Sequence, residues 1–186
     1  MTHNHRAQEP AGVLLDHAEI IKRYCNNLPV LDLACGGGRN GIYLARQGMK
    51  AVFADISWDK LISLHDSVRD LLSRVLICRV DMEKDGLGVF RPGSFGAILV
   101  FRYLHRPLMP FIKDLLAPGG ILVYETFTVD QAKFGKPTNP DFLLKPGELD
   151  EWFGSWEVLH RFEGIQGNPQ KAIANIVCRK PFQHIF

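Results

Sequence analysis

Apolar positions change their spacing along the chain in an order that predicts strands and helices by turns. Aliphatic, β-branched runs predict strands at 29–34, 50–55, 75–80, 95–101 and 120–126. Between them, helical spacing predicts helices over 12–24, 39–48, 57–75 and 107–120. We expect Ser57 to cap the third helix and the Pro-Gly-Gly run at 118–120 to stop the fourth. This alternation indicates a parallel sheet with helices on both faces.

The C-terminal part of the chain departs from this alternation. Two β-like runs, at 155–164 and 171–181, are joined by the short stretch IQGNPQ. A parallel crossover needs about a dozen residues or more, so these runs are expected to pair antiparallel at the far edge of the sheet. The predicted fold is therefore α/β, with a single doubly wound, seven-stranded sheet that is mostly parallel and has an antiparallel strand near the C-terminal edge.

Composition narrows the class of protein. With 186 residues, 46% of them hydrophobic, the chain can bury one good core, so we expect a single domain over 1–186 with flexible residues at 1–10. A formal net charge of +2 gives no reason to expect nucleic acid or an anionic membrane as a partner. The four cysteines lack CxxC spacing, no pair among His17, His65 and His160 has zinc-ligand spacing with a second pair, and the start has no signal-peptide pattern. These features predict a cytoplasmic protein that binds no metal, and its apolar runs are too short to span a membrane.

The stretch VLDLACGGGRN at 30–40 carries the strongest candidate chemistry. It joins a predicted strand to a predicted helix, and Gly36-x-Gly38-x-x-Gly41 satisfies the dinucleotide-binding fingerprint. Glycine permits positive φ and lets a ligand approach the backbone closely. Asp55 ends the next predicted strand, where a carboxylate can accept from both vicinal hydroxyls of a ribose. A nucleotide-like ligand is therefore predicted at this turn.

These motifs resemble those of the class I S-adenosylmethionine-dependent methyltransferases over roughly residues 10–180. The resemblance rests on VLDLACGGGRN, on Asp55, on Asp81 in VDM at the end of the third strand, and on LLAPGGILVYE leading into the fifth. It implies a Rossmann-like sheet and S-adenosylmethionine as cofactor. Within the family, CGGGRN, FRYLHRPL and FLLKPGEL are most similar to the small-molecule branch of tellurite-resistance and thiopurine-type methyltransferases. The implied cofactor site comprises Asp32, Ala34, Cys35, Gly36, Gly38, Arg39, Asn40, Asp55, Ile56, Asp81, Met82 and Phe101.

Asp32 favours this cofactor over NAD. An ionised carboxylate inside an apolar strand is costly unless a positive group compensates it, and the ammonium of the cofactor would be such a group. A dinucleotide offers no cation there, and its pyrophosphate would be repelled. The resemblance also implies that Asp81 accepts from the adenine amine while Met82 packs on the ring. Asp81 as a turn cap, and Cys35 as a small packing residue, remain alternatives.

The methyl acceptor is expected beyond the carboxyl ends of strands four and five. The candidates there for acceptor binding or catalysis are Arg102, Tyr103, His105 and Glu125. A soft sulfur, selenium or tellurium nucleophile would need no catalytic residue, whereas oxygen and nitrogen acceptors often need a general base. The segment 126–149 has no clear period and is expected to form a lid. A small-molecule acceptor is favoured, because neither a substrate module nor a broad basic face is visible.

Two other functions remain open beside methyl transfer to a small molecule. An NAD(P)-dependent oxidoreductase could use a similar sheet, but it would need a proton-transfer pair such as Tyr-x-x-x-Lys. None of the four tyrosines has a lysine four residues on. A non-catalytic S-adenosylmethionine-binding sensor or scaffold is the other alternative, and the presence of Asp32, Asp55 and Asp81 together argues against it.

Overall fold

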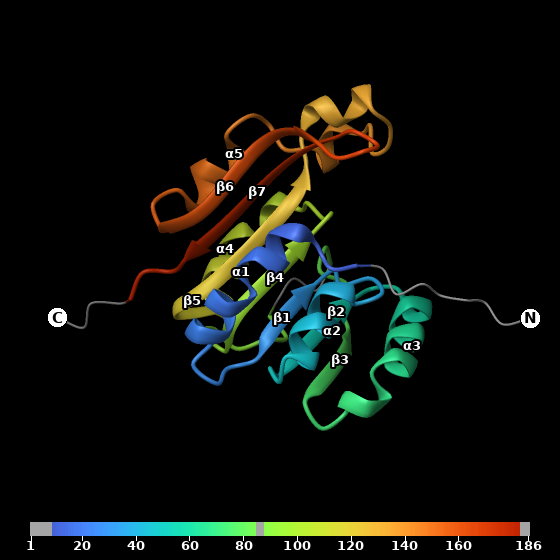
Figure 1. The fold of residues 1–186 in the computed structure, drawn as a ribbon, viewed down its shortest axis with the longest axis vertical. Helices are drawn as coiled ribbons and strands as arrows, with labels where there is room; N and C mark the ends of the chain where they lie inside the picture. Colours follow the sequence, from blue (N-terminus) through green and yellow to red (C-terminus); the bar gives the residue numbers. More distant parts are fainter. Residues whose placement is uncertain (1–8, 85–87, 183–186) are drawn as a thin grey trace, which may run out of the picture.

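The computed structural model describes residues 9–84 and 88–182, and in this part of the chain seven strands form one sheet. The strands lie in the order β3-β2-β1-β4-β5-β7-β6 (Figure 1). The predicted flexibility of residues 1–10 falls mainly outside the described residues. The strand bounds are β1 Val30–Leu33, β2 Ala51–Asp55, β3 Val75–Arg79, β4 Phe95–Phe101, β5 Leu116–Phe127, β6 Glu157–Gln166 and β7 Lys171–Arg179.

Strand direction follows the length of the connections. The first five strands pair in parallel, and β1, β2 and β3, as well as β4 and β5, are linked by crossovers that carry helices. β7 pairs antiparallel with both β5 and β6, and its pairing with β6 follows from the tight hairpin that joins them. The predicted seven-stranded sheet, mostly parallel with antiparallel pairing at the C-terminal edge, is confirmed. The parallel strands bring their carboxyl ends to one edge of the sheet, where the predicted site residues gather.

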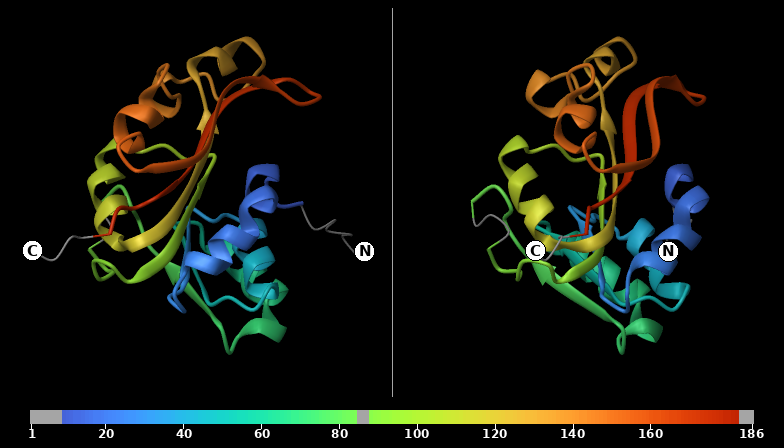
Figure 2. Two further views of the ribbon diagram at one scale, coloured as in Figure 1. Left: turned by 60° about the vertical axis from the view of Figure 1, so that its left-hand side comes forward. Right: turned by 90° about the vertical axis from the view of Figure 1, so that its left-hand side faces the viewer.

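Helices cover both faces of the sheet. Helices α1, α2 and α3 lie on one face, whereas α4 and α5 lie on the other (Figure 2). Within the described ranges, no helix is long and apolar enough to cross a membrane. The bounds are α1 Gly12–Tyr24, α2 Arg39–Arg46, α3 Trp58–Ser67, α4 Met109–Leu115 and α5 Glu148–Phe153, with 3-10 turns η1 Arg69–Leu71, η2 Arg106–Leu108, η3 Val129–Lys133 and η4 Pro140–Phe142.

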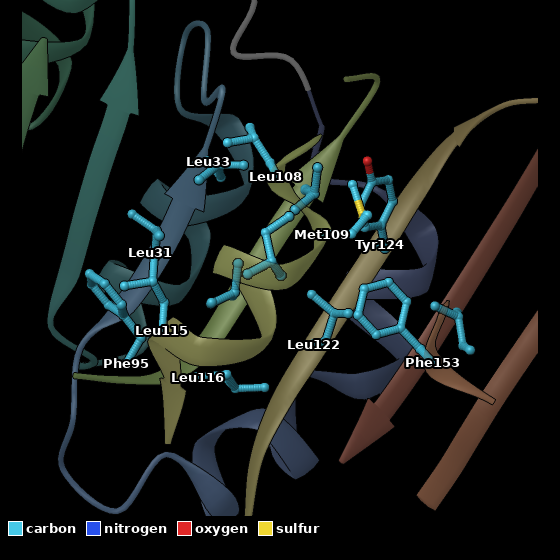
Figure 3. Close-up of a cluster of buried hydrophobic side chains, with 14 of the residues drawn as sticks. Leu31, Leu33, Phe95, Leu108, Met109, Leu115, Leu116, Leu122, Tyr124 and Phe153 are labelled. Carbon is cyan, nitrogen blue, oxygen red and sulfur yellow. The ribbon is translucent and has the colours of Figure 1, made fainter. Parts of the chain in front are cut away.

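Alternation of side chains along β5 divides the core into two layers. Leu122 and Tyr124 point toward α4 and α5, where Tyr124 packs near Phe153 (Figure 3). Ile121 and Val123 point to the opposite face and pack with residues of α1. The strand is therefore buried on both sides, as its continuous apolar sequence predicts. This rigid centre fixes the residues that follow it at the carboxyl end of the sheet.

Two predicted helix boundaries were wrong. The helix that follows Ser57 ends at Ser67 and continues only as the separate turn η1, and the Ser57 side chain makes no capping hydrogen bond. Its amide donates instead to Asp55 Oδ1 at 2.8 Å. α4 ends at Leu115, before the Pro-Gly-Gly run, which lies inside β5 where its pairing with β4 shifts register. Pairing of β5 with its neighbouring strands therefore decides where α4 ends, rather than the Pro-Gly-Gly run.

The predicted lid segment 126–149 has more structure than its sequence indicated. It contains η3, η4 and the first turn of α5, and Leu143 and Leu144 are buried. Gln131 anchors it to β7, because its Oε1 accepts from the Ala172 amide at 2.9 Å. In Figure 1 the segment lies beyond the end of β5, beside the β6–β7 hairpin.

Candidate functional site

The turn between β1 and α2 needs glycine at two positions for conformational reasons. Gly36 has φ +56° and Gly38 has φ +74°, a region that side-chain-bearing residues rarely adopt. The Gly36 amide donates to Asp55 Oδ2 at 2.7 Å, so the turn is tied to the end of β2. A Cβ at Gly38 would lie 2.5 Å from Leu64 Cδ1. The predicted turn is thus a fixed structure, in which the Gly36 amide is engaged by Asp55.

The third glycine of the fingerprint is required for close packing. A Cβ on Gly41 would lie 2.8 Å from Asp32 Oδ2 and would collide with the Phe53 ring. The absence of that atom lets the Gly41 amide donate to Asp32 Oδ2 at 2.8 Å. The amide in the first turn of α2 therefore faces a carboxylate of this chain.

Asp32 is a carboxyl group held in an apolar strand. Only 2% of the residue is exposed. Burial raises the pKa of Asp32 to about 7, although the Gly41 amide and the positive charge of Arg39 oppose the shift. The described chain thus offers Asp32 partial compensation for its charge. A bound cation would complete it and would draw the carboxyl into its ionised form.

Asp55 is presented to the site in a fixed orientation. Its Oδ2 accepts from Gly36 and its Oδ1 from the Ser57 amide, so both oxygens are aligned by backbone groups. Each carboxylate oxygen retains a second lone pair. Asp55 also faces a cleft, and a pair of vicinal hydroxyls could approach its free lone pairs there.

The end of β3 combines a turn cap with the wall of this cleft. Asp81 Oδ1 accepts from the amides of Glu83 at 3.2 Å and Lys84 at 3.3 Å, which confirms the turn-cap alternative. Asp81 lines the cleft as well, and so does Met82, which is 5% exposed and packs into the core. The capping role therefore leaves the carboxylate available to a ligand.

A cleft of about 590 Å³ joins the ends of β1, β2, β3 and β4. Seven of the predicted residues line it, together with Lys60, Glu83 and Lys84, which the sequence analysis did not select. A second cavity of about 390 Å³, between α5 and the β6–β7 hairpin, contains none of the predicted residues. We therefore take the larger cleft as the functional site. The predicted residues in its lining are Ala34, Asp55, Ile56, Asp81, Met82, Arg102 and Tyr103.

Two of the four side-chain-bearing residues with positive φ in the described part of the chain lie where this cleft crosses two neighbouring strands. Ala34, directly after β1, has φ 53°, and Arg102, directly after β4, has φ 58°. Left-handed backbone is unfavourable for side-chain-bearing residues and often occurs at ligand sites, where the surrounding structure maintains it. The Arg102 amide donates to the Glu125 carbonyl at 2.8 Å, which holds the strained conformation. The strained positions turn the chain at the edge of the cleft.

Other predicted cofactor residues lie behind the cleft wall. Asn40 is buried, and its Oδ1 accepts from the Ala11 amide at 3.0 Å, so this side chain fixes the start of α1. Arg39 Nη1 donates to the Glu9 carbonyl at 3.1 Å. Burial and the carboxylates Asp32 and Asp55 raise the pKa of the Cys35 thiol, which agrees with a packing role. Phe101 packs in the core beneath α1.

Two of the four catalytic candidates, Arg102 and Tyr103, line the cleft. Burial, together with the carboxylates of Glu83, Asp81 and Asp55, raises the pKa of Tyr103, so its phenol stays protonated. His105 is half-buried and directly precedes η2, outside the cleft lining formed by the described residues. Glu125 also lies outside that lining and is 4% exposed.

Arg102 and Glu125 form one buried assembly with Asn175. Arg102 Nη2 lies 3.0 Å from Glu125 Oε1, and the Asn175 amide nitrogen donates to Glu125 Oε2 at 3.2 Å. The Arg102 guanidinium also lies over the Phe127 ring, 4.4 Å from its centroid. Sequence reasoning missed Asn175 and Phe127. Asn175 interrupts the apolar run of β7, which was the available signal that it has a polar partner.

A second arginine holds the segment after β5 in place. Arg106 donates through Nε and Nη2 to the two oxygens of Glu148, at 2.6 and 2.8 Å. It also donates to the carbonyls of Asp141 at 3.0 Å and Leu143 at 2.9 Å. Burial alone would raise the pKa of Glu148, but the hydrogen bonds from Arg106 and the Lys145 amide lower it. Arg106 is thus occupied in fixing the fold, whereas Arg102 reaches the cleft.

Comparison with known proteins places this site in context. The family model described as "Tellurite resistance protein TehB" matches residues 11–175. A ubiquinone biosynthesis O-methyltransferase of Xanthomonas campestris pv. campestris is 27% identical over 180 residues, which cover 84% of this chain and 73% of the relative. TehB from Haemophilus influenzae has a similar structure, with a TM-score of 0.75 and 21% identity over 96% of this chain. This chain spans only 64% of that protein's length. A SAM-dependent methyltransferase from Aquifex aeolicus matches with a TM-score of 0.64 and 17% identity, covering 92% of this chain and 93% of the other.

Proposed function

Because the chain belongs to the family of the tellurite resistance protein TehB, we propose that it is an S-adenosylmethionine-dependent methyltransferase acting on a small molecule. The methyltransferases among its relatives support this reaction, and the cleft supplies the groups that the cofactor needs. We propose further that the acceptor atom is a soft nucleophile, either sulfur, selenium or tellurium. The single-domain organisation and a reducing, cytoplasmic setting complete the proposal, and the four free cysteines support that setting.

The observation that carries the proposal is the orientation of Asp55. Two backbone amides fix its carboxylate at the cleft, with lone pairs left for the vicinal hydroxyls of a ribose. Asp32 supplies the second element of fit, since a buried carboxyl with a raised pKa favours a positively charged ligand nearby. Met82 and Ile56 add apolar surface against which an adenine ring could pack.

Methyl transfer from a sulfonium needs little from the protein beyond positioning of the donor and the acceptor. When bound, S-adenosylmethionine supplies a methyl group on a sulfonium, which departs as a neutral thioether. Water exclusion and alignment can then provide much of the rate. Here the strained turns at Ala34 and Arg102 fix the wall on which donor and acceptor would meet. Tyr103 presents a neutral phenol, which can orient a ligand by hydrogen bonding.

The arrangement of carboxylates supports a soft acceptor. Glu125 was a candidate base, but it lies outside the cleft lining formed by the described residues, is 4% exposed and is paired with Arg102. A base needs a free lone pair within reach of the acceptor proton. Thiolates, selenides and tellurides bring their own nucleophilic electron pair, so they do not require one.

The oxidoreductase alternative is disfavoured by the start of α2. In dinucleotide folds the pyrophosphate sits on the amides at this helix terminus. Here the Gly41 amide donates to Asp32, and the carboxyl group stands next to the place that a phosphate would occupy. A non-catalytic sensor is distinguished from the proposed enzyme by the absence of turnover.

Activity would be measured as release of S-adenosylhomocysteine from S-adenosylmethionine. The acceptors would be small thiols, selenite and tellurite, with catechols and amines beside them. The proposal predicts turnover of soft acceptors, with a rate that follows the ionisation of the acceptor rather than a group of the protein. Turnover of catechols or amines alone would contradict the soft acceptor and make His105 the candidate base. Binding of the cofactor without turnover of any class would favour the sensor.

A further inference from the structure

Lys60, the third residue of α3, lies over the glycine turn at the edge of the cleft. A Cβ on Gly36 would lie 3.9 Å from both Cδ and Nζ of Lys60, so the aliphatic stem and the ammonium both border this glycine. Burial is the main cause that raises the pKa of the Cys35 thiol, and the positive charge of Lys60 opposes the rise. Lys60 therefore presents a cation to the part of the cleft that adjoins Gly36.

The carboxylate of Asp55 borders the same glycine. Its Oδ2 accepts from the Gly36 amide at 2.7 Å, and Asp55 and Lys60 both line the cleft. Because the two contacts are to atoms of one residue, about 2.5 Å apart, Lys60 Nζ and Asp55 Oδ2 are separated by no more than about 9 Å. Even so, Lys60 forms no ion pair with Asp55 or with another carboxylate within residues 9–84 and 88–182. A carboxylate and an ammonium thus face one short stretch of the cleft without direct contact.

A ligand group between these two charges must donate to the carboxylate and accept from the ammonium. A hydroxyl does both, since it carries one donor and two acceptor lone pairs. A carboxylate or phosphate placed there would be repelled by Asp55, and an ammonium would be repelled by Lys60. Each oxygen of Asp55 retains a lone pair, and Lys60 offers three N–H donors. The pair therefore favours a neutral group with more than one hydroxyl, such as the vicinal diol of a ribose.

We propose that Lys60 is a binding residue for the ribose of the cofactor, where it donates to the oxygen of a hydroxyl whose proton is accepted by Asp55. Asp55 reads the diol as a donor and Lys60 reads it as an acceptor. Because Lys60 belongs to α3, the contact also ties this helix to the bound cofactor. This inference rests on the proposed S-adenosylmethionine site.

The test uses S-adenosylhomocysteine and its 2′-deoxy and 3′-deoxy analogues, titrated calorimetrically into the full chain. S-adenosylhomocysteine has no sulfonium, so its affinity does not report repulsion between that group and Lys60. Lys60→Met keeps an unbranched apolar stem but removes the ammonium, and it should weaken binding of S-adenosylhomocysteine about fivefold. The same variant should weaken binding of one deoxy analogue by less than about twofold, because the hydroxyl that Lys60 contacts is already missing.

Two further variants control the measurement. Lys22→Met makes the same substitution at an exposed position in the last turn of α1, and it should bind all three ligands as the wild type does. Lys60→Ala also removes the stem and should show the same selective loss, so it serves as the test if Lys60→Met fails to fold. Because Lys60 is exposed, thermal unfolding of each variant should match that of the wild type.

The outcomes separate this contact from the proposed function. Equal losses for all three ligands in the Lys60 variants would place the lysine on another part of the ligand, such as its carboxylate, and would overturn the ribose contact. Unchanged affinities in these variants would overturn it as well. A wild type that binds no S-adenosylhomocysteine contradicts the proposed function itself.

Discussion

Asp32 is the residue at which burial and charge conflict most directly. Burial raises the pKa of Asp32 to about 7, so the folded protein holds this proton more tightly than the unfolded chain. Its contribution to stability is therefore fully present below the ordinary pKa of 3.8 and is lost as pH rises through about 7. An ionised Asp32 is therefore better stabilised when a cationic ligand is bound than in the free protein.

Asp32→Asn should remove this pH dependence. The free energy of unfolding of the variant should rise relative to the wild type between pH 4 and pH 8, by on the order of 4 kcal/mol. Urea unfolding across this range measures it, with Asp16→Asn on the exposed face of α1 as the control. Parallel profiles for the wild type and Asp32→Asn would show that Asp32 titrates normally.

A cationic ligand should make Asp32 favour its ionised form, whereas burial alone favours the protonated form. Positive charge nearby stabilises the carboxylate, so binding of S-adenosylmethionine below pH 7 should release a proton and should tighten as pH rises. Calorimetry in buffers of different ionisation enthalpy detects the proton. Asp32→Asn should bind without releasing it, and equal proton release by both proteins would exclude Asp32 as the source.

Gly36 and Gly37 are neighbours, but only Gly36 has a backbone conformation that favours glycine. Gly36 has φ +56°, whereas Gly37 lies outside the left-handed region, and neither Cβ would meet an atom closer than 3.9 Å. Gly36→Ala should therefore cost about 1 to 2 kcal/mol in stability through backbone strain and should weaken cofactor binding, whereas Gly37→Ala should change stability little. Thermal unfolding and cofactor titration of the two variants test this, and equal effects would contradict it.

At the scale of elements, the Arg106 clamp fixes the segment between β5 and β6. Its guanidinium ties Glu148, the first residue of α5, to the carbonyls of Asp141 and Leu143. Glu148 is 6% exposed, so loss of its partner would leave a buried charge uncompensated. The clamp ties the later part of the segment to η2, whereas Gln131 ties its earlier part to β7.

Arg106→Gln should lower the free energy of unfolding by about 2 to 4 kcal/mol and should accelerate hydrogen exchange at amides of 139–148. Arg161→Gln should cost less than about 1 kcal/mol, because its ion pair with Asp150 is exposed. Urea unfolding and mass-spectrometric exchange measure the two effects. Faster hydrogen exchange in this segment without a change in the free energy of unfolding would mean that the segment opens independently of the sheet.

Elements that follow from local pattern were predictable, and those set by distant contacts were not. The strand that ends at Asp55 and the hairpin of β6 and β7 follow from apolar runs and connection length. The stop of α4 at Leu115 does not, because β5 begins earlier than its composition indicates. The contact between Asn175 and Glu125 joins strands 50 positions apart, and no periodicity encodes which polar residues meet.

At the scale of the molecule, the strand order places the predicted cofactor residues and Arg102 with its partners on different halves of the sheet. The half formed by β1, β2 and β3 presents the acids predicted for the cofactor, and the half formed by β4, β5 and β7 presents Arg102 and its partners. The crevice between them lies where the order of strands reverses, beside β1 and β4. The sequence predicted this division because each acid lies in, at the end of or just after a recognisable strand, whereas the engagement of Glu125 required the structure.

The most direct test of the central claim is calorimetric titration of the full chain with S-adenosylmethionine and, separately, with NAD. We expect binding of S-adenosylmethionine at one site and none of NAD. Asp55→Ala should weaken the former by about 2 to 4 kcal/mol, because two charge-assisted hydrogen bonds are lost and the Gly36 turn is released. Asp59→Ala, on the exposed first turn of α3, should bind as the wild type does. Binding of NAD alone, or an unchanged affinity in Asp55→Ala, would contradict the account.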